Sequence, residues 1–509
     1  MKALNTKKRS VVAITSIVTM SLLVGCSSNT NNAAPPSNSA QGPEPLPIKI
    51  SLNFDGKDIP QPGNEAQKAI EKYTNSKLSI NLISSNDFCS KLPVMIASGD
   101  MPQILASCGA PNQSYLISAA QNGAFWDIGP YIKDYKNLSL MPPAVYDNVK
   151  IDGKLYGIPR YRPFARYAYT YRKDWLTNVG LQQPKTVDDL YNMFKAFTNN
   201  DPDKNGVNDT YGMTMMIKND SLRPDFGVTF GAPNAWGLKD GKFTKSEETP
   251  EYFEAIKFTK KLYDEKLINQ DFASIDVPKF EANLENAKSG VINEATNKIL
   301  TFETRVKSHN PNAVMDAFSI VEGPKGKLIN GERGSNGILM FPKSSVKTEA
   351  DLKQLLGFID KLSDKPMADL LEWGIQGKHY DLKDGKAVRT NQDAFDNEVG
   401  FPYKFPFETV PVTKIRTEGV LDPMTKLQIQ LEEDNDKYAV LDPTIVLISP
   451  TWATKGQELQ QILLDAKVKY IMGKIDENGW KAAIDKFKGA GGDQTAKEYA
   501  EAYAKTQKK

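Results

Sequence analysis

The sharpest chemical pattern in this 509-residue sequence is an acidic loop at 201–209, with the sequence DPDKNGVND. Such loops bind Ca²⁺, a hard cation that takes about six to eight oxygen ligands. The oxygens that the spacing offers are the side chains of Asp201, Asp203, Asn205 and Asp209 and the carbonyl of Val207. Gly206 permits the tight turn, but Gly212 stands where a bidentate Glu would complete the set, so we expect fewer or weaker protein ligands. A structural calcium site and a metal-free Asp/Asn/Gly turn are both open.

A run of Arg and Tyr between residues 156 and 171 has the chemistry to bind sugar. Sugar binding needs flat apolar rings that stack on pyranose C–H faces, and planar polar groups that pair with hydroxyls. The candidate sugar contacts in this run are Arg160, Tyr161, Arg162 and Tyr169. Alternate members of a tyrosine-rich strand would instead face a core. Arginine is costly to bury without an anion, so we also expect Arg160, Arg162 and Arg166 to be able to read a uronic or sulfated sugar.

Residues in loops supply the remaining candidate sugar contacts. Trp236 lies in a Gly/Pro/Asn-rich loop, Trp373 precedes a Gly-Ile-Gln-Gly loop and Trp452 stands at a helix entry. Loops carry function more often than helix interiors. The polar candidates are Glu332, Asn336 and His379. Each has a structural alternative: a solvated turn for the first two, and a loop residue bonded to backbone for the histidine.

Catalytic chemistry finds little support in the composition. The chain has two histidines and no H-E-x-x-H, G-x-S-x-G, Walker A or G-x-G-x-x-G motif. We therefore expect no enzyme and name no catalytic residue. A glycosidase carboxylate pair is defined by separation in space, which leaves a tethered polysaccharide lyase or hydrolase as the alternative function. Lys and Arg total 64 against 62 Asp and Glu, so no charge excess indicates a nucleic-acid partner.

The N-terminal residues predict export and lipid anchoring. A basic patch at 2–9 precedes an apolar stretch at 11–24 that has signal-peptide length and is too short to span a bilayer. The Leu-Val-Gly-Cys that follows resembles a bacterial lipobox, in which Cys26 is lipidated, and two or more acyl chains give a stable anchor. We predict a signal peptide at 1–25 and a flexible Ser/Asn/Gly/Pro-rich tether at 26–47.

The rest of the chain alternates short apolar strands with amphipathic helices, which favours an α/β fold with a mostly parallel sheet. The first elements that the pattern predicts are strands at 48–53, 78–83 and 103–106 and helices at 64–74 and 89–98. The last hundred residues are predicted to be mainly helical. Folding of the second helix back onto the third strand would bring Cys89 and Cys108 together, so a disulfide and two separate thiols are both open.

Seven motifs then follow one another along the chain: the lipobox and the segments 91–105, 152–159, 171–186, 201–212, 262–272 and 373–380. In this order they resemble the extracellular solute-binding lipoproteins of carbohydrate ABC importers, in particular the large Gram-positive branch related to alginate-oligosaccharide-binding proteins. Gln103 departs from the pattern, because the family usually has Asp after this proline.

The resemblance implies an α/β fold of two periplasmic-binding-protein-like lobes, with a hinge between them and a helical C-terminal region. It puts 48–165 and 330–400 in the first lobe, and 166–329 and 401–509 in the second. It also implies a monomeric, lipid-anchored receptor on the extracellular face of the cytoplasmic membrane. Such a receptor would capture an oligosaccharide and deliver it to ABC permease subunits, and any calcium in the acidic loop would be structural.

Overall fold

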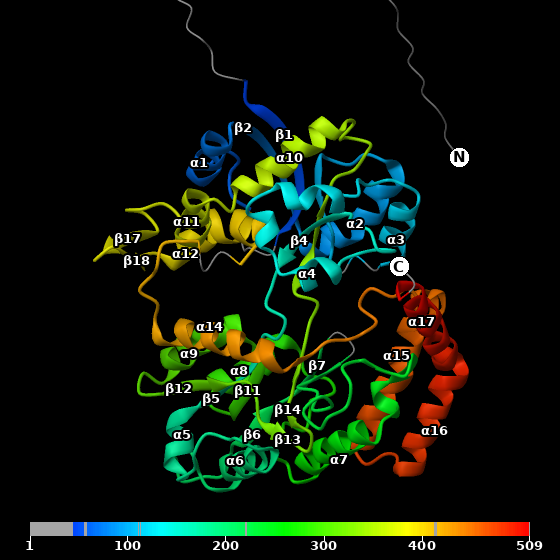
Figure 1. Cartoon of the computed structure of the whole chain (residues 1–509). Coiled ribbons are helices and arrows are strands. Elements are labelled where there is room, and N and C mark those ends of the chain that lie inside the picture. The colour runs from blue at the N-terminus through cyan, green and yellow to red at the C-terminus, as the bar shows by residue number, and fades with distance from the viewer. Residues whose placement is uncertain are drawn as a thin grey trace, which may run out of the picture. The chain divides into compact units, whose positions relative to one another are not determined.

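The computed structural model describes residues 44–54, 59–109, 111, 113–218, 221–411 and 415–507. The predicted signal peptide, Cys26 and most of the predicted tether lie outside these residues. From Pro45 to Lys509 the chain forms one unit, built around two sheets with separate hydrophobic cores (Figure 1). The two lobes expected from the sequence are therefore present.

The first sheet has the strand order β2-β1-β3-β16-β4. Its strands are β2 (Ser76–Ser84), β1 (Leu46–Phe54), β3 (Ile104–Ala106), β16 (Ser335–Met340) and β4 (Gly157–Tyr161). β1 pairs in parallel with β2 and β3, whereas β16 is antiparallel to both β3 and β4. The expectation of a mostly parallel sheet fails here because β16 enters from the second lobe and runs against the strands that lead toward it. β1 also begins inside the predicted tether, since Leu46 and Pro47 already pair with β2.

Helices and a disulfide complete the first lobe. Its helices are α1 (Glu65–Thr74), α2 (Ser85–Ser98), α3 (Ser114–Gln121), α4 (Pro143–Asp147), α10 (Glu349–Lys361), α11 (Lys365–Trp373), α12 (Gln392–Phe395) and α13 (Phe405–Phe407). α1 begins where the Asn64 side chain accepts the backbone N–H of Gln67. Cys89 and Cys108 are joined by a disulfide, with 5.4 Å between their Cα atoms.

The first core extends further along the chain than the sequence indicated. Tyr403, Phe407 and Val410 are buried in it, although the family resemblance implies that the segment from 401 onward belongs to the second lobe. The reason is that these apolar residues pack under the first sheet before the chain crosses. The assignment of the other boundaries remains a prediction from the family topology.

The second sheet has the strand order β12-β5-β11-β6. Its strands are β12 (Met315–Phe318), β5 (Tyr167–Arg172), β11 (Ser289–Ala295) and β6 (Tyr211–Thr214). Alternation along β5 sends Tyr169 and Tyr171 into one core and Ala168 into another on the opposite face. The helices that cover these faces are α5 (Lys173–Asn178), α6 (Val187–Asn199), α7 (Pro250–Asp264), α8 (Val277–Glu285), α9 (Ile299–His309) and α14 (Pro423–Asn435).

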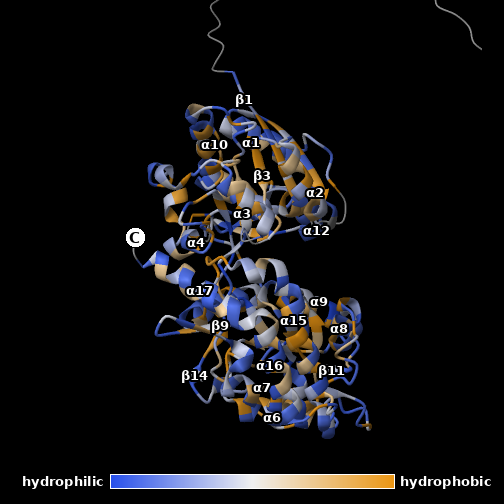
Figure 2. Cartoon of the chain, turned by 90° about the vertical axis from the view of Figure 1, so that its right-hand side faces the viewer, coloured by the Kyte–Doolittle hydropathy of each residue, from blue (hydrophilic) through white to orange (hydrophobic). Residues whose placement is uncertain are grey.

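The C-terminal region is helical, as predicted. It consists of α15 (Pro450–Ile471), α16 (Glu477–Phe487) and α17 (Asp493–Thr506). Leu459, Leu463 and Tyr470 of α15 are buried in the core of the second lobe. Figure 2 shows the corresponding hydrophobic colour on α15, as on β3 of the first lobe. Among the described residues, no helix is both long and apolar enough to cross a membrane.

Short strands and three crossing segments complete the fold. The short strands are β7 (Met216–Lys218), β8 (Ser221–Arg223), β9 (Trp236–Lys239), β10 (Lys242–Lys245), β13 (Glu322–Gly323), β14 (Gly326–Lys327), β15 (Ile329–Asn330), β17 (Tyr380–Lys383), β18 (Lys386–Arg389) and β19 (Ala439–Val440). The chain crosses between lobes after β4, before β16 and after Val410. Backbone hydrogen bonds join these segments: Tyr161 N–H donates to Glu408 O (2.7 Å) and Arg162 N–H to Gly334 O (2.9 Å). This bonded bundle forms the hinge region.

Candidate functional site

A cavity of about 330 Å³ lies in the second lobe, beside the crossing segment that precedes β16. Its walls come from β5, from residues 221–235, from α15 and from the crossing segment at 328–332. The aromatic and amide side chains that line it are Tyr167, Tyr169, Tyr252, Asn234, Asn293, Asn330 and Gln460. Because the crossing segment forms part of the wall, a ligand in this cavity contacts the hinge region directly.

One glutamate and the two lysines with which it forms ion pairs make a buried charged cluster in the cavity wall. Glu247 lies with one carboxylate oxygen 2.6 Å from Lys467 Nζ and the other 3.2 Å from Lys245 Nζ. All three side chains are buried. Burial by itself raises the pKa of Glu247, but the charges of Lys245 and Lys467 outweigh it and lower the pKa to about 2. Glu247 is therefore ionised at neutral pH.

A second acid, Asp225, is held by neutral donors. Its Oδ2 accepts the Tyr252 hydroxyl (2.6 Å) and its Oδ1 accepts the backbone N–H of Gly227 (2.8 Å). Proximity of Asp225 and Glu247, together with burial as the largest cause, raises the pKa of Tyr252. The hydroxyl therefore remains a donor to Asp225.

Arg223 and Tyr167 lie together in the lining of the cavity. The guanidinium of Arg223 lies over the Tyr167 ring, 4.1 Å from its centroid. Next to them, Arg166 Nε donates to Glu332 (2.9 Å). The cavity thus combines an aromatic face, amides, and charged groups that can act as paired donors and acceptors, which is the chemistry that recognises sugar hydroxyls and carboxylates.

Two of the predicted sugar contacts line this cavity. They are Tyr169, whose ring also stacks on Phe318 with 5.2 Å between centroids, and Glu332. Trp236 and Trp452 do not. Trp236 is 2% exposed and packs edge-on against Trp452 and Tyr499, at 5.9 and 5.3 Å between centroids. The structure places these tryptophans against the second core because the loop around Trp236 folds under the C-terminal helices.

The predicted sugar contacts where the chain first crosses between the lobes are bonded to other residues of the protein. Arg160 is buried and donates to Asn53 Oδ1 (2.8 Å) and Ser107 O (3.2 Å). Arg162 pairs with Glu408 (3.3 Å) and lies 5.7 Å from the Phe405 ring. Burial raises the pKa of Tyr161 to about 12. Asn336 is exposed on β16, away from the residues that line the cavity.

Trp373 and His379 belong to the interior of the first lobe. Trp373 is buried, and its Nε1–H donates to Thr417 O (3.0 Å). His379 is 0% exposed, and its Nδ1 accepts the backbone N–H of Ile375 (2.9 Å), which is the structural alternative named for it. Burial lowers the pKa of His379, so the imidazole is neutral at pH 7.

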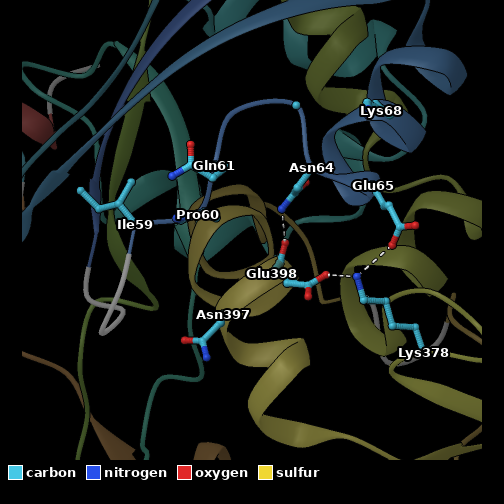
Figure 3. A pocket seen from close by; sticks show the side chains of 10 residues that line it. Ile59, Pro60, Gln61, Asn64, Glu65, Lys68, Lys378, Asn397 and Glu398 are labelled. Atoms are coloured by element: carbon cyan, nitrogen blue, oxygen red, sulfur yellow. Dashed lines mark hydrogen bonds and ion pairs between the residues drawn. The ribbon is translucent and has the colours of Figure 1, made fainter.

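A second cavity, of about 570 Å³, lies in the first lobe around Lys378 and Glu398 (Figure 3). Lys378 bridges Glu65 (2.9 Å) and Glu398 (2.6 Å) across it, and Asn64 Nδ2 donates to Glu398 O (3.0 Å). Its other lining residues are Ile59, Pro60, Gln61, Gly63, Lys68 and Asn397. The polar groups here suit hydroxyls, but the charges neutralise one another within the lobe.

The acidic loop is held together by hydrogen bonds among its own residues. Asp201 accepts the backbone N–H groups of Asn205 (3.0 Å) and Gly206 (2.9 Å). The Asn205 amide donates to both Asp203 and Asp209, and Lys288 Nζ lies 3.1 Å from Asp209. Burial, then Asp201 and Asp209, raise the pKa of Asp203, whose Oδ1 is buried without a hydrogen-bond partner among the described residues.

The carboxylates of the loop and an unpaired buried oxygen fit a hard cation. Within the described ranges, however, no group of three or more acidic, His or Cys side chains converges closely enough to hold a metal ion. The side chain of Val207 is exposed, so only its carbonyl is a candidate ligand.

The sequence pattern did not indicate the charged residues Arg223, Asp225, Lys245, Glu247 and Lys467 of the second-lobe cavity. One signal was available. Lys467 interrupts the apolar stripe Leu459, Leu463 and Tyr470 of α15, and a lysine at such a position needs a buried partner. Nothing in the sequence identified that partner as Glu247.

Two α/β lobes joined by three crossing segments, with a polar and aromatic cavity at a crossing, define a two-lobe binding protein. The profile of the bacterial extracellular solute-binding protein family matches residues 56–363. The lipoprotein LipO of Bacillus subtilis is 34% identical over 491 residues, which cover 95% of this chain and 96% of LipO. The polygalacturonan/rhamnogalacturonan-binding protein YtcQ of the same organism is 35% identical over 446 residues, covering 87% and 88%.

A solved structure has the same fold. It is the ABC-transporter substrate-binding protein FusA of S. pneumoniae, as an EF-hand mutant in complex with fructo-nystose, which matches with a TM-score of 0.62 at 18% identity and covers 91% of this chain and 99% of FusA. The chain belongs to the bacterial extracellular solute-binding protein family. It is a solute-binding receptor.

Proposed function

We propose that this receptor is lipid-anchored at Cys26 on the extracellular face of the cytoplasmic membrane, and that it captures an oligosaccharide for ABC permease subunits. The observation that carries the proposal is the second-lobe cavity, where Tyr167 and Tyr169 lie among amides and charged pairs at the hinge region. Its volume lies at the lower end of the about 300–1,000 Å³ typical of ligand sites. The relatives support the ligand class, since YtcQ is named for binding polygalacturonan and rhamnogalacturonan, and FusA is in complex with fructo-nystose.

Capture works through differential contacts. A sugar shifts the lobes toward closure only if the closed state offers contacts that the open state lacks. Glu332 and Asn330 belong both to the cavity wall and to the segment that leads into the first lobe. A sugar bound to these residues therefore acts on the element about which the lobes turn.

Calorimetry and thermal melting of residues 45–509, which form one compact unit, test the capture of sugar. At a hundred times its Kd, an oligosaccharide adds about 2.7 kcal/mol of stability. Tyr167→Ala should weaken binding, whereas the matched control Tyr191→Ala, a half-buried residue of α6 that does not line the cavity, should not. Stability unchanged by neutral and acidic oligosaccharides, or release of reducing ends by the protein, refutes the proposal.

The anchor has a separate test. Labelled fatty acid should be incorporated into the wild-type protein and not into Cys26→Ser, which should be released from the membrane because no acyl chain holds it. Equal membrane retention of both proteins contradicts this part of the proposal.

We further propose that the loop 201–209 holds a structural calcium ion. Two features of the loop favour a bound cation, namely the buried Oδ1 of Asp203 and the mutual repulsion of the carboxylates. The structure of the relative FusA is described as an EF-hand mutant. Asp201, Asp203, Asn205 and Asp209 would hold the ion, which would neutralise the loop. Ca²⁺ should raise the melting temperature and a chelator lower it. Asp203→Asn should abolish this response and the control Asp264→Asn should not, and a response that survives Asp203→Asn refutes the site.

A further inference from the structure

Among the described residues, one cation that lines the second-lobe cavity has no carboxylate beside it. The cations of the lining are Arg223, Lys245 and Lys467, and the acids are Asp225, Glu247 and Glu332. Glu247 forms ion pairs with both lysines, and Glu332 forms an ion pair with Arg166. Asp225 directs its oxygens to Tyr252 and to the Gly227 N–H. Within the described part of the chain, Arg223 has no ion-pair partner.

The guanidinium of Arg223 is presented to the cavity in a fixed position. It lines the cavity and is held over the Tyr167 ring at 4.1 Å. Its Nε–H is buried without a hydrogen-bond partner in the described ranges. A guanidinium is always charged, and stacking on an aromatic ring leaves its in-plane donors directed outward. Since no described residue accepts from Nε, a ligand in the cavity can supply that acceptor.

We infer that Arg223 reads the carboxylate of an acidic sugar, so that the receptor prefers oligosaccharides that contain uronic acid. This inference rests on the proposed function, because it names the ligand class of the same cavity. Recognition of an acidic sugar is thus assigned to Arg223 in place of Arg160, Arg162 and Arg166. These three side chains are bonded to other residues of the protein. Carboxylate and guanidinium have matching planar geometry, and a hydrogen bond between charged groups is among the stronger kinds in proteins.

Arg333 offers a comparison within the same molecule. Its Nη1 is also buried without a hydrogen-bond partner among the described residues, and it too lies near the crossing. The carboxylates of Asp442 and Glu332, however, interact with its charge. It is also absent from the residues that line the cavity. We therefore assign the preference for acid to Arg223 and not to Arg333.

The test compares trigalacturonic acid, its methyl ester and neutral kestose in calorimetric titrations at low and moderate salt. The wild type should bind the acid more tightly than the ester. Arg223→Gln should weaken binding of the acid about ten- to a hundredfold and leave binding of the ester nearly unchanged, since only the charged hydrogen bonds are lost. Arg223→Lys should recover part of the preference. The control Arg305→Gln, which removes an exposed guanidinium on α9, should leave the ratio of the two affinities unchanged.

The outcomes separate the inference from the proposed function. An unchanged acid-to-ester ratio in Arg223→Gln, or loss of the ratio in Arg333→Gln instead, overturns the inference. Binding of kestose alone by the wild type also overturns it while leaving the proposed function intact. Binding of none of the three sugars counts against both. Melting curves and circular dichroism of Arg223→Gln establish that the variant is folded before its affinities are compared.

Discussion

Neutralising Glu247 should destabilise the second lobe severely. The carboxylate lies between Lys467 and Lys245, at 2.6 and 3.2 Å, and all three side chains are buried. Each pKa unit corresponds to about 1.4 kcal/mol, so a shift from 4.5 to about 2 is worth about 3 kcal/mol of stability at neutral pH. Glu247→Gln also leaves two buried ammonium groups without their anion, so we expect a loss of about 3–5 kcal/mol.

Urea unfolding and thermal melting at pH 7 measure this loss. For a lobe of this size, the expected loss corresponds to a fall in melting temperature on the order of 10 °C. The double variant Glu247→Gln/Lys467→Met should recover more than half of it, because Lys245 keeps its hydrogen bond to Ala235 O (3.0 Å) and only one cation remains. The control Glu303→Gln breaks an exposed pair with Lys307 and should cost at most about 1 kcal/mol.

The same residue predicts a pH dependence. The folded pKa of Glu247 lies below its unfolded value, so its contribution is complete above about pH 4.5 and is lost as pH falls toward 2. The stability of the wild type should fall more steeply in this range than that of Glu247→Gln. A cost below about 1 kcal/mol for Glu247→Gln, or parallel pH profiles of the two proteins, would refute the reasoning.

Three further predictions concern the cores and the disulfide. Reduction, or the pair Cys89→Ser and Cys108→Ser, should cost about 3 kcal/mol because a loop with a sequence separation of 19 is released; a melting temperature insensitive to reductant would contradict this. Gly419→Ala should cost about 1–3 kcal/mol, since its Cβ would overlap the Trp373 ring, whereas Gly489→Ala has open space and should be nearly neutral in denaturant titrations. Trp236→Ala should lower the free energy of unfolding by about 3–5 kcal/mol and leave the ratio of the acid and ester affinities unchanged. A selective loss of sugar binding in this variant would instead show that Trp236 contacts the ligand.

Local sequence predicted the elements well. The helices expected at 64–74 and 89–98 are α1 and α2, and the strand expected at 103–106 is β3. Such segments carry their own signals, as where Asn64 caps α1 and Thr186 forms a capping box with Asp189 at the start of α6. Direction in the sheet was predicted less well, because pairing of β16 with β3 joins segments more than two hundred residues apart.

The candidate site was predicted only in part for a related reason. Tyr169 and Glu332 do line the cavity, and in the acidic loop the Asn205 amide joins Asp203 to Asp209. Trp236 and Trp373 have the side chains that sugar sites use, yet burial in a core uses the same apolar surface, and sequence does not distinguish the two. The run at 160–171 showed the same ambiguity, and there the core alternative applies to Tyr171.

The sequence by itself therefore determined the helices and strands, the motif order that resembles the family, and the acidic loop, because each depends on residues near one another in the chain. Tertiary structure decided which charges are neutralised. Glu247 meets Lys467 from α15, and Arg162 meets Glu408 across the crossings. Among the described residues, Arg223 has the Tyr167 ring beside it and no ion-pair partner. Coulombic pairing acts over a few ångströms in space, whatever the separation along the chain, so this difference among the cations could be identified only from the fold.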